Sequence, residues 1–409
     1  MVDSIREYVS LTFLMVVFFL EGSATALVIA VFTVHARGQH SAGQIFVGIC
    51  VSLYYLAYII TSLLLKPVAQ PRDRFVFGGL LAGVSMIIFA FADLITNVYL
   101  FEILSNICQW FFGIGSMFAW TYGVCAISSM KPDYVHILIP AATFGFFFGM
   151  TFGSLVGPYM YIYFGYIISI GSFGFLMVMF SISFFITFRN KSTNETNTPI
   201  DNLIPEEPYK FLYNKTALII MSSQVHSSVL TGFIEVTITF FLERHFKLRL
   251  EQMAIYIVLA SIATVFSSFV SMFICYAKWS HQLFVFKTFL GIIGPVLMII
   301  VNDASTMNLV VFQIGYMTSD AIRSMSSACL ILVSKSLLLD IYGENYKEFV
   351  YLKSSTVLLL TFGTGKFLGQ MVFGGILTEA FGFSFVCCAI AVISLLFFVL
   401  VCLNYPFKA

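Results

Sequence analysis

The sequence contains few charged residues: Asp, Glu, Lys and Arg make up 10% of its 409 positions, whereas hydrophobic residues make up 59%. A soluble domain of this length carries about a quarter charged residues and roughly half apolar ones. The composition therefore excludes a soluble globular protein. The net charge of +1 gives no indication of a nucleic-acid partner.

Motifs for nucleotides, metals and catalysis are also missing. No glycine-rich loop that ends in Lys and Ser or Thr is present, so ATP is not expected as the energy source. The eight cysteines, from Cys50 to Cys402, all lie in apolar stretches and show neither metal-ligand spacing nor a disulfide framework. No nucleophile–base pair is evident. We therefore expect no cofactor, no metal site and no enzymatic activity.

The sequence consists mainly of apolar blocks separated by short polar breaks. A helix that rises 1.5 Å per residue needs about 20 apolar residues to cross the hydrocarbon layer of a bilayer. The blocks therefore predict an all-α, multi-pass membrane protein of about twelve transmembrane helices. No cleavable signal peptide is expected before the first helix. The predicted spans are 9–34, 44–66, 75–95, 98–128, 137–163, 166–188, 216–242, 252–276, 282–301, 306–338, 352–378 and 383–404.

A polar stretch at 189–215 divides the chain almost evenly. It predicts a linker between two six-helix bundles, at 1–188 and 216–409. Lys and Arg are concentrated in the termini, the linker and the alternate loops on the same side of the membrane, and this excess is typical of cytoplasmic segments. We therefore expect cytoplasmic termini, in the plasma membrane or an intracellular vesicle. The three glycosylation sequons of the linker are then chance matches.

Two acidic residues occupy matching positions in the two halves: Glu21 in the first predicted helix and Glu235 in the seventh. A charge at the centre of a bilayer costs at least about 2.5 kcal/mol, so it normally faces a cavity or a partner. Polar residues that recur every four positions form a stripe around Glu235. Cavity lining and structural bonding between helices both remain open for Glu235. The stripe consists of Ser227, Thr231 and Thr239, with Gln224 and Ser228 alongside.

Further polar residues lie inside predicted helices of the second half. Asp320 and Arg323 are three positions apart, so they either pair on one helix face or line a cavity. Lys366 is a candidate partner of Glu235, of Asp320 or of an anionic substrate. His226 either relays protons or is a satisfied structural histidine. Ordinary interfacial residues are expected near the span ends, at Asp93, Glu102 and Lys287.

The fifth predicted helix contains the stretch GMTFGSLVGPYMY at 149–161. In it, Gly149, Gly153 and Gly157 recur every four residues before Pro158. Glycines at this spacing let two helix backbones touch, and a proline bends the helix. Together with the two six-helix halves, this stretch resembles the antiporter signature of the major facilitator superfamily. Within that family, the chain resembles the drug/proton antiporters and vesicular amine transporters.

Other positions extend this resemblance, and some depart from it. Gly374 and Gly375 resemble a glycine pair of the family's second half, and Leu20–Glu21 resembles the Leu-Asp pair whose carboxylate holds the substrate ammonium in amine transporters. The charged gating motif after the second helix is reduced to Arg72–Arg74. Gln109 stands where the family usually has an arginine in the fourth helix.

The resemblance implies a monomeric secondary transporter in the lipid bilayer, with a small molecule and protons as its partners. In this interpretation the two bundles alternate access to a central site. Glu21 and Glu235 would bind a small organic cation there and exchange it for protons. Arg323 and Lys366 leave an organic anion open as the substrate. The reduced gating motif leaves open a transporter-like protein that escorts or regulates another membrane protein.

Overall fold

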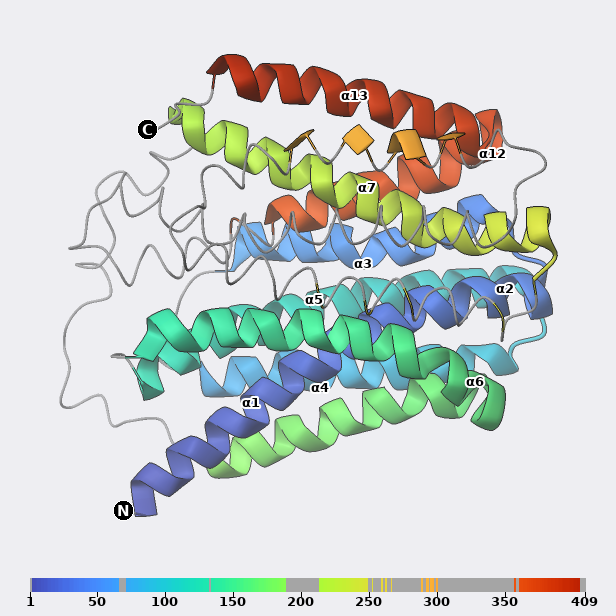
Figure 1. The fold of residues 1–409 in the computed structure, drawn as a ribbon. Helices are drawn as coiled ribbons and strands as arrows, with labels where there is room; N and C mark the ends of the chain where they lie inside the picture. Colours follow the sequence, from blue (N-terminus) through green and yellow to red (C-terminus); the bar gives the residue numbers. More distant parts are fainter. Residues whose placement is uncertain are drawn as a thin grey trace. The chain divides into compact units, whose positions relative to one another are not determined.

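The computed structural model describes residues 2–65, 71–131, 134–188, 213–248 and 360–404, together with Val357 and scattered positions between 252 and 300. The described residues form helices and no strand (Figure 1). Seven helical segments among them are long and apolar enough to cross a membrane. The predicted span at 306–338 lies outside the described residues, as do most of the spans at 252–276 and 282–301.

The chain divides into two compact units. The first unit comprises residues 1–42, 53–208 and 344–356, and the second comprises residues 43–52, 209–343 and 357–409. The helix α3 (Gln44–Leu64) therefore begins in the second unit and ends in the first. The first unit also contains α1 (Val2–Leu27), η1 (Val28–Phe32), α2 (Thr33–His40), α4 (Arg72–Phe91), η2 (Ala92–Leu94), α5 (Val98–Met130) and α6 (Val135–Thr187).

The 53-residue element α6 contains two of the predicted spans. Gly165 alone within it has non-helical dihedral angles, with φ at 78°. This left-handed value is readily adopted by glycine and costs other residues energy. The chain turns back at this point (Figure 1). The break falls between the predicted spans at 137–163 and 166–188, whereas the backbone at Pro158 keeps helical dihedral angles.

The helices α1 and α6 pack backbone to backbone. Gly149 and Gly153 of α6 lie so close to the backbone of α1 that an added Cβ would overlap it. Gly22 of α1 lies against the backbone of α6 in the same way, and Gly157 packs against the side chain of Leu27. The glycine row is therefore a helix-packing surface in this unit. It fixes the position of the α1 segment that carries the first acidic residue.

Basic residues lie at the C-terminal end of α6. Arg6 donates to the carbonyl oxygen of Thr187 at 2.6 Å, and Arg72 donates to that of Phe185 at 2.5 and 3.1 Å. Cations near the last carbonyls of a helix interact favourably with its dipole. Two further contacts involve residues close in sequence to Arg72 and Arg6. Arg74 donates to the Tyr122 hydroxyl at 2.8 Å, and Lys131 pairs with Glu7 at 2.8 Å, a hydrogen bond that raises the pKa of Lys131.

The second unit contains α7 (Lys215–Phe246), a helical segment at 360–367, the π-helix η7 (Leu368–Leu377), α12 (Thr378–Phe381) and α13 (Phe383–Asn404). α7 and α13 lie side by side (Figure 1) and share a buried apolar core. Gly382, with φ at 84°, separates α12 from α13. The described core includes Leu230, Phe233, Ile234, Val386 and Ile390.

The segment at 360–377 packs closely against α7 through small residues. An added Cβ on Gly365 or Gly369 would overlap the backbone of α7, and one on Gly232 of α7 would meet the carbonyl oxygen of Lys366. Gly374 of the predicted glycine pair continues this surface, whereas Gly375 lies near Gly48 and Ile45 of α3. Gly374 lies near α7, and its carbonyl oxygen accepts a hydrogen bond of 2.7 Å from Gln44 of α3. Close helix approach brings the polar side chains of this unit together.

Candidate functional site

Glu21 is fully buried in the middle of α1. The Tyr54 hydroxyl of α3 donates to its Oε1 at 3.3 Å. Its Oε2 has no hydrogen-bond donor among the described residues, and the same part of the chain offers it no salt-bridge partner. An ionised carboxylate without a cation is costly in such a setting, so this group needs a proton or a positively charged partner.

Two buried tyrosines lie next to this carboxyl group. The Tyr54 ring packs against Phe112 of α5 at 4.9 Å and against Tyr58 at 5.9 Å between ring centroids. Tyr58 is also buried, and it lies near enough to Glu21 to interact with it electrostatically. A carboxylate beside aromatic rings is a combination that binds organic cations, because the ring faces attract positive charge.

A polar face of α5 meets α3 next to this group. Gly113 lies so close to the carbonyl oxygen of Tyr54 that an added Cβ would overlap it. Gln109 and Ser116 are four and three positions from Gly113, so all three share one helix face. The Gln109 Nε2 atom is buried and has no hydrogen-bond partner among the described residues, whereas Ser116 lies close enough to Glu21 to interact with it. The Gln109 amide group is therefore a donor available for a polar ligand.

Glu235 has a different environment in the second unit. Lys366 donates to its Oε1, and Gln370 donates to its Oε2 at 3.1 Å. Lys366 is fully buried, whereas Glu235 is 19% exposed. Of the three partners left open for Lys366, the structure places Glu235 at its ammonium group. The two charges compensate each other, and this pairing explains how a carboxylate is accommodated in the apolar helix α7.

The other predicted site residues lie apart from this pair or outside the described residues. The His226 Nε2 atom lies 2.8 Å from the Ser394 hydroxyl of α13, within hydrogen-bond distance, and its ring stacks on Phe397. His226 also lines an apolar pocket of about 390 Å³ between α7, η7 and α13. Asp320 and Arg323 fall outside the described residues. In the stripe on α7, the described buried residues are Gln224, Ser227 and Ser228.

Comparison with known proteins decides the family. A family model described as Major Facilitator Superfamily matches residues 14–351. The chain belongs to the major facilitator superfamily. Its fold is similar to that of a bacterial homolog of the human lysosomal transporter Spinster, solved in an inward-facing and unoccupied conformation. The two are 15% identical with a TM-score of 0.69, and the match covers 98% of this chain and 96% of the homolog.

Two structures of the nucleoside transporter NupG share the same fold. One is of a variant, with 12% identity, a TM-score of 0.72, and coverage of 97% of this chain and 100% of NupG. The other also has 12% identity, with a TM-score of 0.70 and coverage of 98% and 100%. No curated protein matches the chain. Membership of the major facilitator superfamily makes the chain an all-α, multi-pass membrane protein and supports a transporter of a small molecule.

Sequence reasoning did not identify the tyrosines of this superfamily member's first unit. Tyr54 and Tyr58 are four positions apart in SLYYLAY at 52–58, so they share a helix face. That spacing inside an apolar span predicts an aromatic face on this helix, but it does not predict which helix packs against that face. Gln370 was likewise not identified as a site residue from the sequence, and the structure places its amide group on Glu235.

Proposed function

We propose that the protein is a secondary active transporter of a small organic cation, driven by exchange for protons. The observation that carries this proposal is the buried Glu21 carboxyl group, which one tyrosine hydroxyl contacts and which has no ion-pair partner among the described residues. A substrate ammonium or a proton satisfies the same carboxylate, and the two compete for it. Release of one on binding of the other couples their movement across the membrane.

The aromatic surroundings support an amine or another organic cation. The buried Tyr54 and Tyr58 lie close to Glu21, and Phe112 packs against the Tyr54 ring. An organic cation gains both an ion pair with the carboxylate and ring contacts that a small inorganic ion uses less well. These surroundings support the part of the proposal that assigns the protein to the branch of the drug/proton antiporters and vesicular amine transporters.

The pair of Glu235 and Lys366 supports a conformational role in the second unit. Its charges are matched, so Lys366 has its own carboxylate partner and provides weaker support for an anionic substrate. We assign the pair, with Gln370, to positioning α7 against η7 during alternating access. The glycine contacts between these helices let them slide without bulky side chains in the way.

The proposal is tested by uptake of labelled amines and polyamines into proteoliposomes with an acidic interior. Wild-type protein should accumulate at least one cation in a manner that requires the proton gradient. Glu21→Gln should reduce this uptake at least about tenfold, since it removes the charge that pairs with the substrate. Glu102→Gln is the matched control, because it makes the same change at a partly exposed position of α5.

The outcomes separate the remaining function classes. Uptake that survives Glu21→Gln would contradict the assigned role of this carboxyl group. Gradient-dependent uptake of organic anions but not cations would favour an anion transporter. No uptake of either class by well-folded protein would favour an escort or regulator of another membrane protein.

A further inference from the structure

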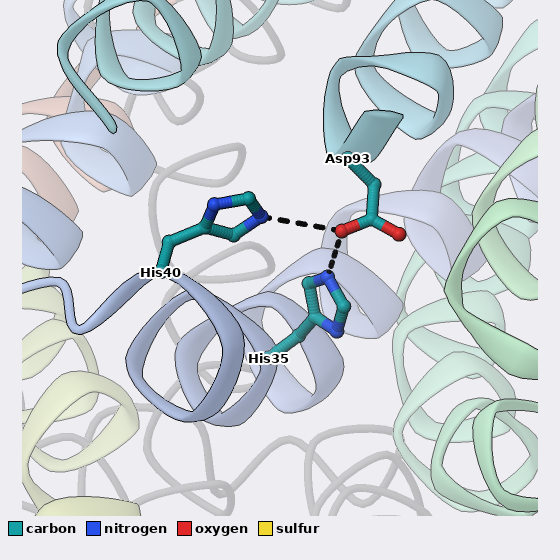
Figure 2. A group of neighbouring side chains, drawn as sticks. All are labelled: His35, His40 and Asp93. Carbon is teal, nitrogen blue, oxygen red and sulfur yellow. Dashed lines mark hydrogen bonds and ion pairs between the residues drawn. The ribbon is translucent and has the colours of Figure 1, made fainter. Parts of the chain in front are cut away.

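Three side chains from two elements of the first unit converge on one point (Figure 2). His35 and His40 lie on α2, and Asp93 lies on η2, the short turn after α4. The Nε2 atom of His35 is 2.5 Å from Asp93 Oδ1, and that of His40 is 3.2 Å from the same oxygen. Asp93 is therefore more than the ordinary interfacial residue expected from its position in the sequence.

Both imidazole rings are held in place by their neighbours. The His35 ring stacks on Tyr166 with 3.9 Å between centroids, and its Nδ1 lies 3.1 Å from the Tyr161 hydroxyl. The His40 ring stacks on Phe101 at 3.7 Å. A histidine whose second nitrogen bonds a fixed oxygen has its ring orientation set, as is typical of metal-ligating histidines. Both Nε2 atoms therefore point at Asp93 without further rearrangement of the helix.

The dimensions of the cluster suit a small metal ion. One ligand atom from each residue lies within 4.8 Å of the other two. Zinc bonds of about 2.0–2.2 Å at tetrahedral angles place neighbouring ligand atoms roughly 3.3 Å apart. The His40–Asp93 distance of 3.2 Å already matches this spacing, and a small rotation of the Asp93 side chain lengthens the distance to His35. Asp93 is 23% exposed, so an ion and a water ligand can reach the site.

We propose that His35, His40 and Asp93 form a binding site for a transition-metal ion such as Zn²⁺. Two imidazole nitrogens and one carboxylate oxygen are a ligand set that zinc uses, with water in the fourth position. The bound ion would fasten α2 to η2, two segments that are more than 50 positions apart in sequence and otherwise joined here by hydrogen bonds. The site is separate from Glu21 and does not depend on the proposed substrate.

The test is calorimetric titration of the purified full-length protein with ZnCl₂, using an affinity tag without histidine. Wild-type protein should bind one equivalent of Zn²⁺. His40→Gln and Asp93→Asn should each weaken binding at least tenfold. His226→Gln is the control, because it removes a histidine outside the cluster and should leave Zn²⁺ binding unchanged. Size-exclusion elution and circular dichroism check that each variant is folded.

A second measurement distinguishes coordination from loose association. Co²⁺ in place of Zn²⁺ should give the visible absorption bands of a tetrahedral site, and these bands should disappear in Asp93→Asn. Absence of saturable Zn²⁺ binding by the wild type would overturn the proposal and leave the cluster as a hydrogen-bond network. Binding that persists unchanged in both variants would also overturn it, since the ion would then lie elsewhere.

Discussion

Glu21 and Glu235 are the same residue type at matching places in the sequence, yet their environments differ. Lys366 and Gln370 satisfy both oxygens of Glu235, whereas Tyr54 contacts one oxygen of Glu21 and the described residues leave the other unpaired. A matched ion pair is stable without a ligand, while a lone buried carboxyl group needs one. This difference is why we assign substrate binding to Glu21 and positioning to Glu235.

The Tyr54 hydroxyl is predicted to hold Glu21 in its binding orientation. Tyr54→Phe keeps the aromatic ring and removes the donor 3.3 Å from Oε1. A hydrogen bond to a charged group contributes about 1.5–3 kcal/mol, so the half-saturating amine concentration should rise roughly tenfold or more. Uptake assays over a range of amine concentrations measure this change. Tyr99→Phe, at a 78% exposed position, is the control, and equal behaviour of the two variants would contradict the prediction.

The pair of Lys366 and Glu235 should show strong energetic coupling. Lys366→Met leaves Glu235 without its cation and should lower the free energy of unfolding by about 3 kcal/mol, near the lower end for a buried pair because Glu235 is 19% exposed. The double variant with Glu235→Gln removes both charges, so it should recover much of this loss. Thermal unfolding in detergent of both single variants and the double variant measures the coupling. Additive losses would show that the two charges act independently.

At the scale of elements, the contact between α1 and α6 allows a test. We predict that the replacement of Gly by Ala has opposite effects on stability at two positions of α6. Ala in place of Gly normally stabilises a helix interior by about 0.5–1 kcal/mol. Gly145→Ala should do so, because nothing lies within 4 Å of the added Cβ. Gly153→Ala places that Cβ against the backbone of Ser23, so it should destabilise the protein by roughly 1–3 kcal/mol. Unfolding temperatures of the two variants test the difference in sign.

The helices themselves were largely predictable from the sequence, because span length and hydropathy are local properties. The predicted limits at 98–128 and 383–404 agree closely with α5 and α13, and the gap between 163 and 166 contains the break at Gly165. The α-helical pattern did not predict that η7 would be a π-helix, in which hydrogen bonds skip one more residue. That change of register affects which side chains of 368–377 face α7.

The candidate site was predictable only in part, since its residues meet through tertiary packing. The cost of a buried charge identified Glu21, Glu235 and Lys366 individually. It left Glu235, 131 positions away, as one of three candidate partners of Lys366, and it did not pair Tyr54 with Glu21, 33 positions away. Such pairs depend on which helices touch, and in this chain the glycine contacts decide that.

At the scale of the whole molecule, the residues that remain of the gating motif, Arg72–Arg74, contribute contacts between helices of the first unit. Arg72 binds the Phe185 carbonyl oxygen in the last turn of α6, and Arg74 binds the Tyr122 hydroxyl of α5. Arg6 and Lys131 make further contacts near the same ends of α1, α5 and α6. Basic residues therefore stabilise the ends of several helices within the first unit, at the segments for which the distribution of Lys and Arg predicts a cytoplasmic location.

The membrane orientation gives the last prediction. If the linker is cytoplasmic, Lys191→Cys should react with a membrane-impermeant maleimide only after the cells are permeabilised. Gln39→Cys, at an exposed position in the last turn of α2, should react in intact cells that carry the protein at the plasma membrane. The wild type gives the background from its eight cysteines, which lie in apolar segments. The reverse labelling pattern would place the termini outside, and the Lys and Arg excess would then lie on the wrong side for the positive-inside rule. In the expected orientation, the cluster of His35, His40 and Asp93 meets the external or luminal solution, where it can respond to metal ions outside the cytoplasm.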